Sequence, residues 1–240
     1  MEHVLAAVGV RKQFGALAVL DGVDFAVGPG AAVGIVGPNG AGKTTLLNVL
    51  AGSLPPDAGR VELGGVDVTG KGAAKRCRLG IGRAYQIPKP FKNMTVFENV
   101  LVGSSSGGRK RGRKGYAAAV DALELCAMTD LANRRAESLG LLHRKRLELA
   151  RALATGPEVL LLDEIGGGLT DAEAQELVET IGEIRSRGTT IIWIEHIVHI
   201  LVQVVERLVC MDQGRIIADG EPDLVMKDAR VIDAYLGTTV

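Results

Sequence analysis

Aromatic residues, patterned cysteines and long apolar runs are all scarce in these 240 residues. Only 3% of the residues are aromatic, so the core must be aliphatic and an exposed aromatic side chain becomes informative. Cys77, Cys126 and Cys210 form no C-x-x-C pair, which argues against a zinc site or a disulfide framework and is typical of reduced intracellular thiols. Lysine and arginine total 28, as do aspartate and glutamate, and this balance argues against nucleic-acid binding over the whole surface.

No membrane-spanning segment and no signal peptide are expected. The most apolar stretch, 191–205, is interrupted by Glu195, His196, His199 and Gln203. The first residues have no charged n-region, apolar h-region and cleavage pattern. We therefore expect a cytoplasmic protein that reaches a membrane only through a partner. The length fits one domain, with room for an inserted subdomain.

Strand-like and helix-like segments alternate at both ends of the chain, which predicts an α/β core with parallel strands. Strands at 3–10 and 17–27, joined by a turn at Gly15, and at 60–68 predict an N-terminal layer that is partly antiparallel. Further strands are expected at 32–36, 159–162 and 189–194, with a hairpin at 208–218. Helices are expected at 43–51, 170–187, 197–206 and 231–236.

The middle of the chain has a helical pattern at 94–102, 116–129 and 143–154. We interpret 88–155 as a helical subdomain inserted between core segments 1–87 and 156–240, all within one domain. Residues 103–115 are rich in serine and glycine, and five of the six residues from Arg109 to Lys114 are basic. A flexible, solvated loop is the simpler interpretation; contact with anionic lipid headgroups is the alternative.

The segment Gly37-Pro38-Asn39-Gly40-Ala41-Gly42-Lys43-Thr44 fits the pattern GxxxxGK[ST] at every position. It follows a predicted strand and precedes a predicted helix, so an ordinary glycine-rich turn is a poor explanation. Glycines let backbone N–H groups surround a phosphate, and the helix N-terminus adds positive potential. Lys43 can reach the phosphates and the Thr44 hydroxyl can bind Mg²⁺. The candidate nucleotide ligands are Asn39, Gly40, Gly42, Lys43, Thr44 and Thr45.

A second half of this site follows the apolar segment 159–162. Asp163 at the end of that strand is placed to hold Mg²⁺ through water, and Glu164 to deprotonate an attacking water. Two neighbouring carboxylates can also be solvated loop charges, but the phosphate-binding pattern favours the catalytic interpretation.

The order and spacing of these motifs resemble the ATPase subunits of ATP-binding cassette (ABC) transporters over essentially the whole chain. The resemblance implies that ATP and Mg²⁺ bind and that Phe14 stacks on adenine, although a core phenylalanine is the alternative. It implies that Gln86 senses Mg²⁺ and the attacking water, and that His196 contacts the γ-phosphate. The predicted catalytic residues are then Glu164, His196 and Gln86, and the predicted metal ligands are Thr44, Gln86 and Asp163.

Longer segments resemble one branch, the branched-chain amino acid importers. They are Arg83–Phe91, Met94–Val100, Arg146–Leu153 and Val231–Gly237. This implies a peripheral subunit at the cytoplasmic face of the inner membrane, paired with a second ATPase, identical or a sibling. It also implies integral membrane permease subunits, which dock on the segment from Gln86 to about Val100. A periplasmic binding protein is an indirect partner. Urea and amide importers share much of this pattern, so the substrate stays open.

The signature loop of the family, LSGGQ, is degenerate here. The corresponding residues are Leu139-Gly140-Leu141-Leu142-His143, so a glycine stands in place of the serine and leucines in place of both glycines. Gly140 has no hydroxyl, and Leu142 is expected to hinder close approach to the other subunit's ATP. Ile165 replaces the usual proline, and Thr170 stands where many members have aspartate.

Other functions fit the sequence less well. A GTPase or small-molecule kinase needs an N-K-x-D base reader or an arginine-rich lid, and no N-K-x-D occurs. Non-transport ABC ATPases typically carry long coiled-coil or zinc insertions, and a lipid exporter would differ in its membrane subunit. The sequence therefore predicts an α/β P-loop ATPase that powers an ABC importer and has no nucleic-acid partner.

Overall fold

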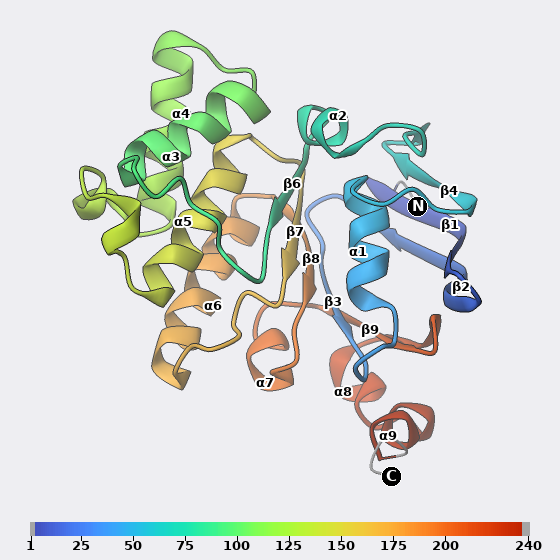
Figure 1. Cartoon of the computed structure of the whole chain (residues 1–240). Coiled ribbons are helices and arrows are strands. Elements are labelled where there is room, and N and C mark those ends of the chain that lie inside the picture. Colours follow the sequence, from blue (N-terminus) through green and yellow to red (C-terminus); the bar gives the residue numbers. More distant parts are fainter. Residues whose placement is uncertain (1–2, 237–240) are drawn as a thin grey trace.

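Figure 1 shows the layers of a computed structural model that describes residues 3–236. A six-stranded sheet with strand order β10-β9-β3-β8-β7-β6 crosses the molecule. Strands β9 to β6 are parallel, and β10 pairs antiparallel with β9 at the edge. The six strands are β3 (Ala32–Val36), β6 (Ile81–Ala84), β7 (Val159–Asp163), β8 (Thr190–Ile194), β9 (Arg207–Asp212) and β10 (Arg215–Gly220).

A smaller antiparallel sheet, with strand order β2-β1-β4-β5, lies on one side of the larger one. The predicted α/β fold with an N-terminal antiparallel layer is confirmed. The single strand expected at 60–68 is wrong in detail, because Gly64 and Gly65 have φ of 55° and 73° and turn the chain into a hairpin. The four strands are β1 (Leu5–Phe14), β2 (Leu17–Val27), β4 (Ala58–Leu63) and β5 (Val66–Asp67).

Helices cover both faces of the six-stranded sheet. Strand β6 and helix α2 were not predicted, and the helix expected at 197–206 is the single turn of α7. The end of the helix expected at 231–236, Gly237, lies outside the described residues. Outside the middle region the helices are α1 (Lys43–Ala51), α2 (Ala73–Arg78), α6 (Asp171–Ser186), α7 (Val198–Leu201), α8 (Pro222–Val225) and α9 (Ala229–Leu236).

Parallel strands in the centre of the sheet are buried on both faces. In β7, Leu160 and Leu162 belong to the core on the face of the sheet covered by α5 and α6. Val159 and Leu161 belong to the core on the opposite face, which α1 and the smaller sheet cover. All five residues of β7 are buried. This explains why the strand is a continuous apolar run and why its last residue, Asp163, reaches the edge where the other parallel strands also end.

The middle of the chain contains helices in place of strands. The flexible loop predicted at 103–115 is wrong at both ends, because the π-helix Gly103–Gly107 continues α3 and packs tightly on α5, and a helix begins again at Gly112. Only 108–111 lie outside a helix. A Cβ atom on Gly103 would lie 2.3 Å from the Arg151 carbonyl oxygen. The elements are α3 (Val96–Val102), η1 (Gly103–Gly107), α4 (Gly112–Leu125), η2 (Thr129–Leu131), η3 (Ala136–Ser138) and α5 (Leu141–Ala154).

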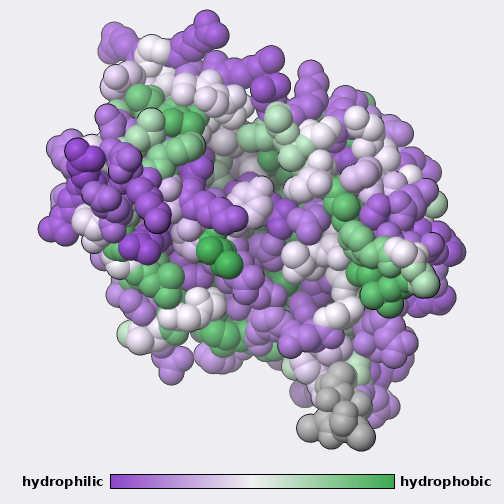
Figure 2. All heavy atoms as spheres, viewed as in Figure 1, coloured by the Kyte–Doolittle hydropathy of each residue, from purple (hydrophilic) through white to green (hydrophobic). Residues whose placement is uncertain are grey.

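Helix α6 begins where the sequence indicates. The Thr170 hydroxyl accepts from the Glu173 N–H, and the Glu173 carboxylate accepts from the Thr170 N–H, which forms the predicted capping box. None of the helices within 3–236 has the length and apolar character that crossing a membrane requires. Figure 2 shows hydrophilic residues over most of the face in view, with apolar residues in separate patches.

Candidate nucleotide site

The phosphate-binding motif forms a glycine loop between β3 and α1. A Cβ atom on Gly37 would lie 2.0 Å from the Met211 carbonyl oxygen, and one on Gly42 would lie 2.6 Å from the Val19 carbonyl oxygen. Gly37, Gly40 and Gly42 have φ of 143°, 83° and 100°, which only glycine adopts freely. The loop borders a cavity of about 180 Å³, whose walls contain all six predicted P-loop ligands together with Glu164.

The start of α1 provides the positive end of a helix dipole in this cavity. No side chain caps α1, whose first N–H groups have no acceptor within the helix. An anion in the cavity would accept hydrogen bonds from those N–H groups. The arrangement therefore suits a phosphate group.

Lys43 is buried beside its own loop. Its Nζ donates to the carbonyl oxygens of Gly37 at 2.6 Å and Pro38 at 2.9 Å. Burial lowers the pKa of Lys43, and the nearby charge of Glu164 partly opposes this effect. A bound phosphate would neutralise the positive charge of Lys43, which the two uncharged carbonyl oxygens cannot do.

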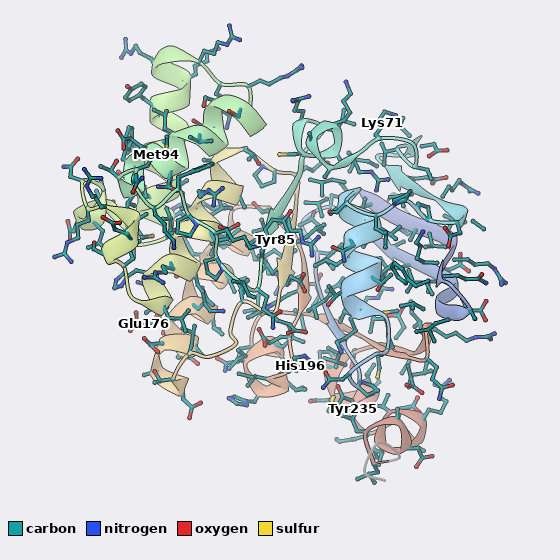
Figure 3. All side chains as sticks on the ribbon, viewed as in Figure 1. Lys71, Tyr85, Met94, Glu176, His196 and Tyr235 are labelled. Atoms are coloured by element: carbon teal, nitrogen blue, oxygen red, sulfur yellow. The ribbon has the colours of Figure 1, made fainter. Side chains whose placement is uncertain are left out.

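Glu164 brings together the three predicted catalytic side chains. Gln86 Nε2 donates to one carboxylate oxygen of Glu164 at 2.6 Å, and His196 Nε2 lies 2.8 Å from the other. Gln86 follows β6, Glu164 follows β7 and His196 follows β8, so three neighbouring parallel strands deliver them to one edge. Figure 3 shows His196 and Tyr85, the neighbour of Gln86, around the central part of the face in view.

Asp163 has a partner that the sequence interpretation missed. Its carboxylate is buried and accepts from Arg83 Nη2 at 2.5 Å, while Arg83 Nη1 donates to Asn48 of α1 at 2.7 Å. Arg83 therefore links β6, β7 and the helix behind the phosphate loop. The sequence signal was an arginine inside an otherwise apolar strand that leads directly to Gln86.

The predicted magnesium ligands line two different cavities. Thr44 borders the phosphate cavity, whereas Asp163 and Gln86 border a second cavity of about 420 Å³. No cluster of three His, Cys, Asp or Glu side chains suitable for a metal occurs within 3–236. Mg²⁺ usually takes one or two protein oxygens plus phosphate oxygens and water, so the Thr44 hydroxyl and Asp163 carboxylate fit its chemistry.

Glu195 is a further polar side chain that organises the site, and the sequence did not predict this role. The buried Glu195 carboxylate accepts from the Gly166 N–H at 2.9 Å and the His196 N–H at 3.0 Å. It thus ties the loop after Glu164 to the segment that carries His196. In the sequence, Glu195 interrupts an apolar run and stands next to His196 at the end of a predicted strand, which indicates a polar site but not these two contacts.

Tyr235 reaches the phosphate loop from the other end of the chain. Its hydroxyl oxygen, on α9, accepts from the Gly37 N–H at 2.9 Å. Burial raises the pKa of Tyr235, so the phenol stays protonated at neutral pH. The sequence signals for this residue were the scarcity of aromatic residues and the resemblance of Val231–Gly237 to the branched-chain amino acid importers, and neither indicated a contact with the phosphate loop.

Phe14, the predicted adenine-stacking residue, is 51% exposed at the end of β1. The alternative of a core phenylalanine is therefore wrong. Phe14 does not border the phosphate cavity, and Lys12 Nζ lies 5.7 Å from its ring centre. Its role toward adenine stays a prediction.

The degenerate signature loop forms the start of α5. Gly140 is the N-cap, with φ of −68° and ψ of 174°, and no heavy atom lies within 4 Å of a Cβ placed there. The expectation that Leu142 hinders close approach is wrong, because that side chain is buried with 7% exposure. Leu141 is the exposed one, at 44%, and its Cδ2 would lie 3.3 Å from a Cβ on Gly168.

Comparison with known proteins identifies the class. Residues 20–166 match the family described as ABC transporter, and residues 215–240 match the branched-chain amino acid ATP-binding cassette transporter family. The chain is 36% identical to the high-affinity branched-chain amino acid transport ATP-binding protein LivG of Escherichia coli K12, over 98% of each chain. It is 34% identical to BraF of Pseudomonas aeruginosa, described in the same words, again over 98% of each chain.

Solved structures agree with this assignment. A nucleotide-free ATP-binding cassette from an ABC transporter superposes with a TM-score of 0.89 at 33% identity, covering 98% of this chain and 99% of that one. The ADP conformation of such a cassette gives a TM-score of 0.90 at 34% identity, covering 99% and 100%. The chain belongs to the ABC transporter family, and it is an ATP-hydrolysing transport subunit of that family.

Proposed function

We propose that this ATPase powers the import of branched-chain amino acids and that Glu164 is the base for the attacking water. The observation that carries the catalytic part is the position of Glu164, which borders the phosphate cavity and whose carboxylate contacts both Gln86 and His196. One carboxylate oxygen of Glu164 contacts Gln86 and the other contacts His196, so these two side chains together orient the carboxylate. The names of the relatives and the C-terminal family match support the substrate.

The residues have distinct tasks in this proposal. Lys43 leaves the carbonyls of Gly37 and Pro38 and donates to the phosphates, where its charge is better compensated. Thr44 and Asp163 hold the magnesium ion, which, when bound, would neutralise phosphate charge. Gln86 and His196 release Glu164 toward the water and the γ-phosphate. Phe14 stacks on the adenine.

The catalytic part is tested by Glu164→Gln. ATP binding should persist while turnover falls at least ~10²-fold, the scale of one general base. Glu158→Gln is the matched control, because Glu158 is exposed at the opposite end of β7. Normal turnover in Glu164→Gln, or an equal loss in the control, would contradict the proposed role.

The permease docks, in this proposal, in a groove between α2, the π-helix and α5. A cavity of about 330 Å³ has walls from Cys77 of α2, Gly107 of the π-helix and Arg151 of α5, and Tyr85 joins it to the cavity beside Gln86. Tyr85 and Ile87 are apolar and exposed, at 46% and 67%. The segment from Gln86 to about Val100, which was predicted to dock the permease, borders only the second cavity, through Gln86, Ile87 and Lys89.

Cysteine crosslinking to the co-expressed permease tests this groove together with the second cavity, which Ile87 borders and Tyr85 joins to the groove. Cys77 lies in the groove and would react itself, so the background is Cys77→Ser. Ile87→Cys should crosslink to the permease, whereas Val66→Cys, 60% exposed on the smaller sheet, should not. A crosslink from Val66→Cys alone would place the permease elsewhere.

The substrate is tested by uptake in the source organism. Deleting the gene should lower high-affinity uptake of radiolabelled leucine, and restoring it should recover that uptake. Unchanged leucine uptake with lost urea or amide uptake would favour the alternative importers. A periplasmic binding protein and a second ATPase subunit complete the proposed assembly on the cytoplasmic face of the membrane.

A further inference from the structure

Basic residues are concentrated in one part of the chain. Residues 68–120 contain 12 of the 28 basic residues but only one of the 28 acidic residues, Glu98. The neutral total therefore conceals two oppositely charged regions. Arg76 and Arg83 are internal, where they bind backbone carbonyls and Asp163 respectively, and the other ten basic residues are exposed or partly exposed.

Most of these charges flank the groove proposed for the permease. We define the basic edge as the following residues: Lys71, Lys75, Arg78, Arg109, Lys110, Arg111, Arg113 and Lys114. The first three belong to α2 or the turn before it, and the others follow the π-helix. Helix α2 packs on the π-helix, since a Cβ on Gly107 would lie 3.2 Å from Cys77 Sγ. Figures 1 and 3 show α2, the start of α4 and many nitrogen-tipped side chains along the upper margin.

The charges around the start of α4 are unfavourable for the isolated chain. A helix N-terminus favours acidic residues, as at Glu98 of α3 and Glu173 of α6, but α4 has no acidic residue in its first turn and no side-chain cap. Arg113 and Lys114 lie in that turn. No ion pair in the described part of the chain involves a residue of the basic edge. An external anion would relieve this repulsion.

We propose that the basic edge binds anionic lipid headgroups of the membrane that holds the permease. The inference rests partly on the proposed docking groove, because a permease seated there brings both flanks of the groove toward the bilayer. Long, exposed and unpaired basic side chains are what an anionic bilayer surface attracts. A single-stranded nucleic acid would favour interleaved aromatic residues, and residues 103–115 contain none.

Vesicle flotation of the purified full chain tests the proposal without permease or ATP. At about 0.1 M salt the chain should float with vesicles that contain roughly one-third phosphatidylglycerol and not with pure phosphatidylcholine. The quadruple variant Arg109→Gln, Arg111→Gln, Arg113→Gln and Lys114→Gln should bind at least about 100-fold more weakly, since each basic residue near the surface contributes roughly fivefold.

The matched control removes the same net charge elsewhere. It combines Arg60→Gln, Arg187→Gln, Arg215→Gln and Arg230→Gln, all exposed and outside the basic edge. This control should bind anionic vesicles within a few-fold of the unmodified chain, and raising the salt should release both. Equal losses in the two quadruple variants, no preference for anionic vesicles, or preferential binding of an oligonucleotide would overturn the proposal.

A check on folding keeps the two proposals separable. Both quadruple variants should retain the ATPase activity and melting temperature of the unmodified chain, because neither touches the nucleotide site. Loss of vesicle binding with normal ATPase activity supports the basic edge as the lipid contact. Normal flotation of the unmodified chain without a crosslink from Ile87→Cys to the permease would contradict the docking groove and leave the lipid contact standing.

Discussion

Glu164 has a left-handed backbone conformation, with φ of 48°, that is uncommon for residues other than glycine. Its N–H donates to the Ile194 carbonyl at 2.8 Å, and its side chain contacts Gln86 and His196. These contacts come from the ends of β6 and β8, the two strands that flank β7, and hold the residue in a conformation that a free loop would avoid. Strain at this position is consistent with a side chain whose placement matters more than local stability.

Lys43→Ala should weaken ATP binding about 10- to 100-fold and leave the fold intact. The reason is the loss of a charged donor to phosphate, worth about 1.5–3 kcal/mol. Calorimetric titration with ATP measures the affinity, and circular dichroism checks the fold. Lys227→Ala, on the surface beyond α8, is the control. Unchanged ATP affinity in Lys43→Ala would show that the glycine loop is not the nucleotide site.

Tyr235→Phe should raise the KM for ATP about three- to tenfold and leave kcat nearly unchanged. The substitution removes the acceptor of the Gly37 N–H, a hydrogen bond worth about 0.5–1.5 kcal/mol, so the loop loses part of its preorganisation. Tyr116→Phe is the control, since Tyr116 is exposed on α4 and packs on Phe97. A fall in kcat with constant KM, or no change in either, would exclude a positioning role for Tyr235.

At the scale of elements, the π-helix is the least expected feature. Gly103→Ala should lower the free energy of unfolding by about 1–3 kcal/mol, because its methyl group would press on the Arg151 carbonyl of α5. For a chain of this size each kcal/mol shifts the melting temperature by about 2–4 °C.

Gly182→Ala is the matched comparison for Gly103→Ala. Gly182 lies within α6, and no heavy atom lies within 4 Å of its Cβ position. Alanine there should raise stability by up to about 1 kcal/mol, because it is the better helix former. The melting temperatures of both variants test this difference. Equal changes in melting temperature would show that close packing at Gly103 is unimportant.

The start of α5 accepts a serine without rearrangement. Gly140→Ser should raise the ATPase activity of the purified chain about 10- to 100-fold, because the hydroxyl restores a donor to a phosphate held by the other subunit. The open space around Gly140 and its extended backbone suit a serine N-cap.

Leu142 must be kept in that experiment. Its side chain is buried, so shortening it would cost stability and confuse the result. Leu141→Gly instead removes the exposed leucine beside Gly168. If neither Gly140→Ser alone nor Gly140→Ser with Leu141→Gly raises the activity, backbone N–H groups replace the hydroxyl.

At the scale of the whole molecule, the complete phosphate loop and the degenerate signature loop predict unequal sites if this chain pairs with a sibling ATPase that has an intact LSGGQ loop. ATP on Lys43 of this chain would meet the sibling's intact loop and turn over, whereas ATP on the sibling would meet Gly140. The chain alone should therefore hydrolyse ATP slowly, and adding the sibling should increase turnover. The comparison of isolated and mixed subunits measures this; equal rates would refute the asymmetry.

The sequence by itself determined most of the chemistry. Three of its patterns are local, because each depends on residues close together in the chain. They are the spacing within the phosphate motif, the apolar strand that ends in Asp163-Glu164, and the capping box of α6. The layers of the fold followed from strand and helix alternation for the same reason. Phe14 illustrates the limit, because its pattern could not distinguish a core residue from an exposed one.

Only the tertiary structure decided the contacts between distant segments. Tyr235 and Gly37 are 198 residues apart, and Arg83 and Asp163 are 80 apart, so no local pattern relates them. The π-helix was also hidden, because serine and glycine favour a flexible loop unless another backbone, here that of α5, packs against them. Whether Leu141 or Leu142 faces outward depended on where α5 begins, and that is fixed by packing rather than by composition.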